Sequence, residues 1–383
     1  MQFGAPAQID LFIENINQKT KDKIKILTKS DQPKMGWFSV YTPEEIIYAA
    51  GIMPFRITGD LAPASIKSRA ILFSNICPYT LSCFEEGIQG IYNFLDGVVM
   101  VNTCDARRRL YDAWKMYLKT PFIHIIDLPK TVAPESSNYF ENQFFKFKDA
   151  LENHFKYKIS EKLLNEAICL YNKTRILLSQ LYELRKRKDP PIKGSEALAI
   201  VMASMAGDRR DFNEGLGSLL KKLNGLSNGP NKKNKRILIT GSYFDQLGLI
   251  KMIEDLGAIV VCEDLSNGIK YFEGSVEITK EPVKALAEYY LNKAPCARMA
   301  DSEKRSKDIL KLVKDYKVDA VIYFALKFCD SNLIDFPYQK NKLSEAGIPV
   351  LFLEGERTMV NLGQLKTRVQ AFLEINGGLG QIS

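Results

Sequence analysis

Histidine is the scarcest residue that could carry chemistry, because the 383-residue chain contains only His124 and His154. A His-rich zinc site or a histidine-based catalytic triad would need both side chains to converge with further partners, so both classes of site are disfavoured. No apolar stretch reaches the roughly 18 to 20 residues that cross a bilayer. The first residues also lack a basic start followed by an unbroken apolar block. We therefore expect no signal peptide, no membrane partner and a cytoplasmic protein.

Two short signatures are missing as well. The sequence has no G-x-x-x-x-G-K-[ST] motif, which argues against a nucleotide site of its own. It has no C-x₂-C pair and no ferredoxin-like run of cysteines, so spacing alone does not define a metal site. An intracellular chain keeps its thiols reduced. The seven cysteines are therefore expected as free thiols, metal ligands or a nucleophile rather than as disulfides.

The charge balance is mildly basic, with a net charge of +8. Such a surplus can serve an anionic ligand, an acidic protein or nucleic acid. The basic residues lie in short runs, such as Arg107-Arg108-Arg109, without interleaved aromatic residues or a nucleic-acid-binding module. We therefore interpret these runs as solvated surface and expect no nucleic-acid partner.

The segment 224–236 is rich in turn formers and charge, which predicts a linker between two domains. A short apolar run over 236–241 that ends in glycine, a helical pattern over 246–257 and a second apolar run over 258–262 follow it. This order predicts a right-handed βαβ unit with a parallel sheet. The expected organisation is an N-terminal helical segment over 1–34, a first α/β domain over 35–140, a helical region over 141–223 that packs on the α/β domains, and a second α/β domain over 237–383.

The two halves of the chain repeat one pattern. In each half a buried apolar strand ends in Cys-Asp, first at Cys104-Asp105 and then at Cys329-Asp330, and a helical stretch and a second strand follow. We therefore predict an α/β fold of two related, doubly wound parallel-sheet domains.

Ligands of open parallel sheets bind outside the carboxyl ends of the strands, where both of these cysteines fall. Asp105 and Asp330 are preferred N-cap residues, which would place each thiolate beside free backbone N–H groups and the positive end of a helix dipole. That environment suits an anionic metal–sulfur centre. Cys77 also falls in a loop at a sheet edge. On spacing alone, plain packing of three buried cysteines is the better explanation.

Several motifs occur in order along the chain: WFSVYTPEEIIYAAGIMP at 37–54, NICPY at 75–79, NTCD at 102–105, KFCD at 327–330, AGIP at 346–349 with Glu354, and GQLKTRVQAF at 363–372. Together they resemble the 2-hydroxyacyl-CoA dehydratase and benzoyl-CoA reductase family. The resemblance implies two flavodoxin-like domains with an additional helical part. It also implies that Cys77, Cys104 and Cys329 hold one [4Fe–4S] cluster and leave one of its irons without a protein ligand.

The function implied by the resemblance is that of a catalytic-component subunit of a 2-hydroxyacyl-CoA dehydratase. A separate ATP-hydrolysing iron–sulfur activator would supply one electron, the thioester carbonyl would become a ketyl radical, and this radical would expel the hydroxyl group and return the electron. The implied partners are an acyl-CoA thioester and a homologous second subunit, or a second copy in a homodimer. Three alternatives stay open: a subunit of an ATP-dependent benzoyl-CoA-type reductase, a subunit that only relays electrons, and a cluster-free binding or scaffold protein.

The other cysteines are interpreted one by one. Cys83 is taken as a packed thiol, with a place near the cluster as the alternative, and Cys169 as a core residue of a helix. Cys296 resembles a recurrent family feature that would line the cleft. Relatives with a fused double cluster use a further cysteine in the segment matching 263–268, where this chain has Ser266, although Cys262 is close by. The serine argues against a double cluster.

Polar candidates come from two of the resembling motifs and from one strand end. Ser39 and Glu45 are predicted to act in catalysis, the serine as a hydrogen-bond donor to a substrate oxygen and the glutamate in proton transfer. The alternative for Glu45 is a helix-favouring acidic first turn. Ser242 follows a predicted strand and is expected to present its backbone N–H to the site. Gln364 and Arg368 would meet CoA phosphates or a partner subunit, or only anchor the last helix.

Overall fold

The computed structural model describes residues 31–60, 66–205, 207–226, 234–357 and 362–376. Within them lie two four-stranded sheets in which every pair of neighbouring strands is parallel. The helical segment expected over 1–34 falls almost entirely outside the described residues. The domain boundaries expected from the sequence stay a prediction.

The first sheet has the strand order β2-β1-β3-β4, and the second has the order β6-β5-β7-β8. The strands are β1 (Lys34–Trp37), β2 (Met53–Arg56), β3 (Gly97–Val101), β4 (Phe122–Ile126), β5 (Lys235–Gly241), β6 (Ala258–Asp264), β7 (Ala320–Leu326) and β8 (Val350–Gly355). The same order in both halves confirms the prediction of two related, flavodoxin-like α/β domains. The inner strands β3 and β7 are buried along their whole length, as the continuous apolar runs GVVMV and AVIYFAL require.

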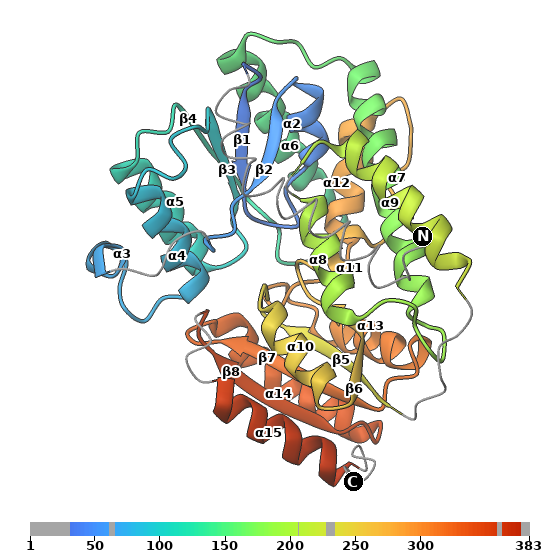
Figure 1. The fold of residues 1–383 in the computed structure, drawn as a ribbon. Helices are drawn as coiled ribbons and strands as arrows, with labels where there is room; N and C mark the ends of the chain where they lie inside the picture. The colour runs from blue at the N-terminus through green and yellow to red at the C-terminus, as the bar shows by residue number, and fades with distance from the viewer. Residues whose placement is uncertain (1–30, 61–65, 206, 227–233, 358–361, 377–383) are drawn as a thin grey trace.

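Helices cover the sheets on both sides and form a further layer that flanks the two domains. They are α2 (Glu44–Ala49), α3 (Ile66–Ile71), α4 (Pro78–Ile88), α5 (Asp105–Tyr117), α6 (Pro134–Phe155), α7 (Glu161–Leu184), α8 (Gly194–Ser204), α9 (Arg209–Asn224), α10 (Leu247–Asp255), α11 (Ile269–Phe272), α12 (Pro282–Asn292), α13 (Ser302–Asp315), α14 (Asp330–Glu345) and α15 (Leu362–Ile375). In Figure 1 the first sheet lies above the second, and α7, α8 and α9 run along one side of the molecule. Helix α12 packs on α6 and α7, so the flanking layer is built from both halves of the chain.

Buried ion pairs fasten this layer to both domains. Helix α2 of the first domain is joined to α9 by Glu44–Arg209 and to α7 by Glu45–Arg175. Strand β6 of the second domain is joined to the C-cap residue of α7 by Glu263–Arg185. Each of the three carboxylates also accepts a hydrogen bond from a buried tyrosine: Tyr271, Tyr290 and Tyr182 respectively. Removing one partner of such a pair costs on the order of 3 to 5 kcal/mol, because the other charge is left buried and unpaired.

Gly241 brings the ends of β5 and β7 together. Its φ is +123°, and a Cβ at this position would lie 2.0 Å from the carbonyl oxygen of Phe324 on β7. Only glycine has both the required backbone conformation and the required space. The residue after it, Ser242, is thereby held against the end of β7.

Cys169 is not a core residue, contrary to the sequence prediction, because its side chain is exposed on α7. The buried positions of α7 recur at a helical spacing that includes Ala167, Ile168 and Tyr171. Position 169 lies about 100° around the helix from position 168 and so leaves that face. The apolar residues beside Cys169 in the sequence therefore led to the wrong prediction that its side chain is buried.

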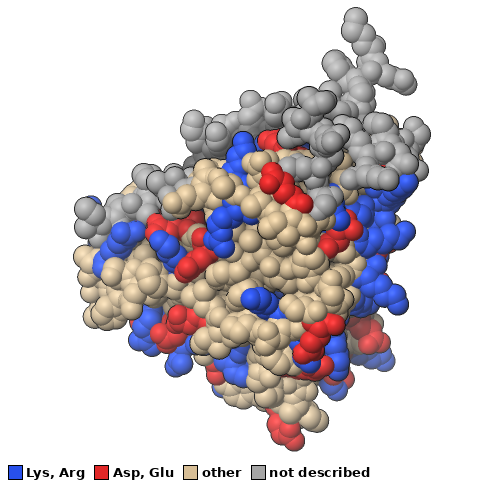
Figure 2. Space-filling model, turned by 90° about the horizontal axis from the view of Figure 1, so that it is seen from below, with Lys and Arg blue, Asp and Glu red and all other residues tan. Residues whose placement is uncertain are grey.

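The surface carries both signs of charge. On the lower face of the molecule, Lys and Arg are interspersed with Asp and Glu over much of the area, and basic side chains gather along one edge (Figure 2). No helix in the described ranges has the length and apolar character to cross a membrane.

Candidate functional site

The carboxyl ends of both sheets meet at one cavity of about 120 Å³. Its lining comes from strand ends and from the loops and helices that follow β1, β2 and β3 of the first sheet and β5, β6 and β7 of the second. Cys77, Cys104 and Cys329 all line this cavity, which we call the cysteine pocket. Three thiols separated by as many as 252 positions in the sequence thus share one space between the two domains.

Each of the three cysteines is the N-cap residue of a helix: Cys77 of α4, Cys104 of α5 and Cys329 of α14. The sequence predicts Asp105 and Asp330 at this position, but both aspartates lie one residue later, in the first helical turn. With a cysteine at each N-cap, the thiols lie closer to the positive helix ends than the sequence predicts. The backbone N–H of the residue three positions further on favours the thiolate in each case, at Thr80, Arg107 and Asn332.

The three thiols differ in acidity. A hydrogen bond from the Cys77 thiol, together with hydrogen bonds from Ser242 and Asn332, lowers the pKa of Cys329 to about 6 against the effect of burial. The Asn332 side-chain amide donates to Cys329 Sγ at 3.2 Å. The pKa of Cys77 is raised because its proton is shared with Cys329 and because the group is buried. Burial also raises the pKa of Cys104, although the nearby Arg107 guanidinium opposes this. One thiolate and two thiols therefore face the pocket near neutral pH.

Two arginines that sequence reasoning missed as site residues, Arg56 and Arg107, also line the cysteine pocket. The Arg56 guanidinium lies 4.5 Å from the ring centre of Trp37, and the Arg107 guanidinium lies 4.3 Å from that of Phe38. No Asp or Glu is found among the described residues that line the pocket. The electrostatic environment of the three thiols is therefore positive.

The structure separates the two predicted catalytic residues. Ser39 lines the cysteine pocket, and its Oγ accepts a hydrogen bond from the backbone N–H of Tyr41 at 3.2 Å. The Ser39 hydroxyl proton remains available for another acceptor. Glu45 does not line the pocket, because its carboxylate pairs with Arg175 and accepts from Tyr290 Oη at 2.9 Å. The proton-transfer role of Glu45 stays a prediction.

Ser242 takes part in the site through its hydroxyl and not through its backbone N–H, which donates to the Phe324 carbonyl at 2.9 Å. The Oγ accepts from the backbone N–H of Leu326 at 3.1 Å and favours the thiolate of Cys329. Arg368 donates to the Phe352 carbonyl at 2.7 Å, which holds α15 on β8, and Gln364 is exposed on the same helix. Neither faces the cysteine pocket.

The remaining thiols fall into two groups. Cys296 lines the cysteine pocket, and its backbone N–H donates to Tyr41 Oη at 3.0 Å. Ser266, at the position expected for a further cluster cysteine, also lines the pocket. Cys83 and Cys262 are fully buried, and burial raises the pKa of Cys83 to about 12. Both are packed thiols outside the pocket.

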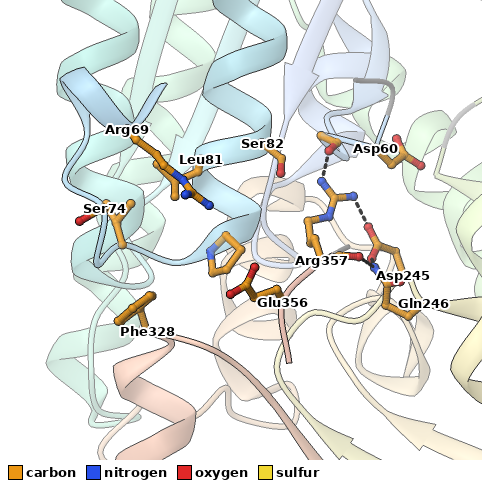
Figure 3. A pocket seen from close by; sticks show the side chains of 13 residues that line it. Asp60, Arg69, Ser74, Leu81, Ser82, Asp245, Gln246, Phe328, Glu356 and Arg357 are labelled. Atoms are coloured by element: carbon orange, nitrogen blue, oxygen red, sulfur yellow. Dashed lines mark hydrogen bonds and ion pairs between the residues drawn. The ribbon is translucent and has the colours of Figure 1, made fainter. Parts of the chain in front are cut away.

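A second cavity, of about 340 Å³, lies beside the cysteine pocket and is shown in Figure 3. Pro78 and Phe328, the neighbours of two pocket cysteines, form part of its lining. Arg357 crosses the border between the domains here, because its guanidinium contacts the carbonyl of Gly59 and the carboxylate of Asp245 (Figure 3). No motif in the sequence indicates this contact, which we call the Arg357 clasp.

The cysteines in the described part of the chain are not arranged to hold one metal ion. Among the described residues, no group of three or more His, Cys, Asp and Glu side chains is arranged to hold one. A four-iron cube binds each cysteine through a different iron and so keeps its ligand sulfurs further apart than one ion does. Three thiols that face one small cavity, with positive charge nearby, fit such a cube in number and chemistry, although Cys77 and Cys329 are in hydrogen-bond contact with each other.

The sequence matches the family described as "2-hydroxyglutaryl-CoA dehydratase, D-component" over residues 39–376. It is 26% identical over 365 residues to the (R)-phenyllactyl-CoA dehydratase beta subunit of Clostridium sporogenes, covering 95% of this chain and 97% of that protein. It is 27% identical over 324 residues to a benzoyl-CoA reductase subunit of Thauera aromatica, covering 83% and 84%. It is 23% identical over 347 residues to the (R)-2-hydroxyglutaryl-CoA dehydratase beta subunit of Acidaminococcus fermentans, covering 89% and 91%.

These matches confirm the resemblance indicated by the motifs. They extend through both sheets and the helices between them, so they concern the whole two-domain unit and not one motif. Because the family match covers most of the chain, this protein belongs to the 2-hydroxyglutaryl-CoA dehydratase D-component family and is an enzyme of the dehydratase or reductase type.

Proposed function

We propose that this chain is the iron–sulfur subunit of a 2-hydroxyacyl-CoA dehydratase, in which Cys77, Cys104 and Cys329 hold one [4Fe–4S] cluster. The observation that carries the proposal is the meeting of these three thiols, each at a helix N-terminus, where the carboxyl ends of the two sheets face each other. When bound, such a cluster supplies one-electron chemistry at the iron that has no protein ligand.

The protein's own residues prepare the pocket for this group. Ligation requires thiolates, and the helix N-termini favour them at all three positions. Asn332 and Ser242 fix the Cys329 sulfur, which is the most acidic of the three. The pocket also excludes carboxylates that would repel an anionic centre, as far as its described lining shows. These features support a cluster held between the domains.

Ser39 is the residue that we assign to the substrate. Its hydroxyl lies in the pocket with its acceptor side occupied by the Tyr41 N–H, so the hydroxyl proton can be donated to an oxygen of an acyl-CoA thioester. A hydrogen bond of this kind orients the carbonyl and stabilises negative charge on it. Glu45 is not included in this proposal, because it is engaged in a buried ion pair.

The partners follow from the sequence and from the names of the relatives. The chain has no phosphate-binding loop motif, so ATP would be hydrolysed by a separate iron–sulfur activator. Two of the relatives named above are called beta subunits, which supports a homologous second subunit for this chain. The place of action would be the cytoplasm. A subunit of a benzoyl-CoA-type reductase is the second candidate, supported by the 27% identity to such a subunit.

The test begins with anaerobic reconstitution with iron and sulfide. The wild-type chain is expected to bind about four irons and four sulfides and to show the visible absorption of a cluster. Cys77→Ser, Cys104→Ser and Cys329→Ser should each lose most of this iron, while Cys169→Ser, at an exposed thiol, should keep it. A wild-type protein that takes up no iron would refute the proposal.

Turnover then separates the functional classes. With its activator and second subunit, the loaded protein should dehydrate a 2-hydroxyacyl-CoA, and Ser39→Ala should lower kcat while keeping the iron content. If Ser39→Ala left turnover unchanged, the subunit would only relay electrons. Net consumption of electrons with an aromatic thioester would favour the reductase instead.

A further inference from the structure

We propose that Arg56 and Arg107 turn the cysteine pocket into an anion site, in which their free guanidinium N–H groups hold and charge-balance a negatively charged occupant. The identity of that occupant as the thiolate-bound cluster rests on the proposed function. The existence of the anion site does not depend on it and is tested separately.

The first argument is the state of the two guanidinium groups. The Arg56 side chain belongs to a residue that is 3% exposed, and Arg107 is 6% exposed. In each, the Nε and Nη1 atoms are buried and have no hydrogen-bond partner in the described structure. An arginine cannot lose its charge in a protein, and buried N–H groups without partners destabilise the fold. Four such atoms around one cavity point to an acceptor that belongs there.

The second argument is a comparison with the other buried arginines. Arg175, Arg185, Arg209 and Arg305 each form an ion pair with a buried carboxylate. Arg209 also has Nε and Nη1 atoms without a hydrogen-bond partner, so the difference lies in the counter-charge. Arg56 and Arg107 have no carboxylate partner within the described ranges, and no Asp or Glu of those ranges lines their pocket. The fold therefore neutralises these other buried arginines but leaves the two beside the cysteines without a counter-charge.

The third argument is the way aromatic rings hold the two cations. Arg56 lies 4.5 Å from the ring centre of Trp37 and 5.4 Å from that of Tyr243. Arg107 contacts the rings of Phe38 at 4.3 Å and Tyr79 at 5.2 Å, and Tyr79 stacks on Tyr243 at 4.2 Å. Rings cover the flat faces of the guanidinium groups, so hydrogen bonds can form only at their edges. The donors are thus fixed in place before any ligand arrives.

A cluster held by the three thiolates would supply acceptors for these donors. The thiolates and sulfides carry net negative charge, and their sulfurs accept N–H hydrogen bonds. Such bonds and nearby positive charge stabilise the reduced form and raise the reduction potential. Arg107 already stabilises negative charge at the pocket, because its positive charge favours the thiolate form of Cys104. The two arginines would therefore set how readily the pocket accepts an electron.

The first experiment uses the iron-free protein and inorganic sulfate at constant ionic strength. Sulfate should raise the Tm of the wild type, and Arg56→Met and Arg107→Met should bind it about tenfold or more weakly, the effect of losing a charge-assisted hydrogen bond. Arg108→Met is the matched control, because Arg108 is the exposed neighbour on the same helix and its loss changes the net charge equally. Without sulfate, both pocket variants should unfold at or above the wild-type temperature, because each removes an unpaired buried cation.

A purely structural role for the arginines would give the opposite pattern. The methionine variants would then be less stable than the wild type and would keep the wild-type response to sulfate. Arg107→Lys provides a second variant that retains the charge but loses the fixed donors, and it should bind sulfate more weakly than the wild type. An identical sulfate response in wild type, pocket variants and control would overturn the anion site.

The second experiment uses the reconstituted protein and measures the midpoint potential of the cluster by a redox titration followed by EPR. Arg56→Met and Arg107→Met should retain iron and shift the potential downward, while Arg108→Met should stay near the wild-type value. Unchanged potentials with a raised KM for the acyl-CoA would show that the arginines serve the substrate, which overturns the assignment to the cluster. If the wild type takes up no iron, the proposed function fails, and the sulfate experiment alone decides the anion site.

Discussion

Asn332→Ala tests the hydrogen bonding that distinguishes Cys329 from the other pocket cysteines. The pKa of Cys329 is lowered to about 6, compared with about 8.5 for a free thiol. The Asn332 amide donates to the sulfur at 3.2 Å, and a hydrogen bond to a charged group contributes about 1.5 to 3 kcal/mol. At 1.36 kcal/mol per pH unit, its loss should raise the pKa of Cys329 by about one to two units.

The assay is alkylation of the iron-free protein with iodoacetamide at a series of pH values, with each cysteine quantified by mass spectrometry of its peptide. Only the thiolate reacts, so the rate at Cys329 should rise as the pH increases through about 6, and in Asn332→Ala this rise should move to higher pH. Cys83 is the internal control, because burial raises its pKa to about 12 and it should react little below that pH.

The lowered pKa of Cys329 also makes the stability of the folded protein depend on pH. Because the pKa of Cys329 is lower in the folded protein than in the unfolded chain, its ionisation stabilises the fold above the ordinary thiol pKa. That contribution is lost as the pH falls through about 6. A Cys329 that reacts with the pH dependence of a free thiol in the wild type would refute the reasoning. So would an Asn332→Ala variant with an unchanged profile.

Three further predictions concern the frame around the site. Glu45→Gln should lower the free energy of unfolding by about 3 to 5 kcal/mol in urea titrations, because Arg175 is left buried without its carboxylate. The folded variant should still bind iron. A loss of less than about 1 kcal/mol would contradict a strongly stabilising buried pair. Gly241→Ala should cost on the order of 3 kcal/mol or more in the same assay, because its Cβ would collide with the Phe324 carbonyl, and a neutral effect would show that the strand ends can separate. Asp245→Asn should weaken the Arg357 clasp and increase the rate of amide hydrogen exchange near Gly59 and at the start of α10. Unchanged exchange rates would mean that the clasp does not hold the domains together.

The sheets were predictable because their signals are local. Apolar runs such as 97–101 and 320–326 identify buried central strands, and the repeated Cys-Asp at their ends identifies the edge where a ligand binds. The sequence places the capping role one residue too late. Aspartate is a common capping residue in helices, but here each cysteine takes that position and the acid moves into the first turn.

The two arginines of the cysteine pocket, Arg56 and Arg107, could not be predicted from the runs of basic residues in the sequence. The run that contains Arg107 predicts solvated surface, and Arg108 and Arg109 are indeed exposed. Three residues after the capping cysteine, however, a helix returns to the same face, and this turns Arg107 alone toward the pocket. Arg56 ends a strand and offers no signal at all in the sequence. Its role depends on Tyr243, which lies in the other domain and is brought close only by the fold.

Because the two halves of the chain repeat one fold, the cysteines of the pocket occupy corresponding places in the two domains. Cys77 lies between the second and third strands of the first domain, and Cys296 lies between the second and third strands of the other. Cys104 and Cys329 each follow a third strand. Cys77 and Cys296 thus occupy matching places in the two halves, as do Cys104 and Cys329, and all four line the cysteine pocket. Because each half of the chain supplies two of these four thiols, the pocket exists only where the two domains meet.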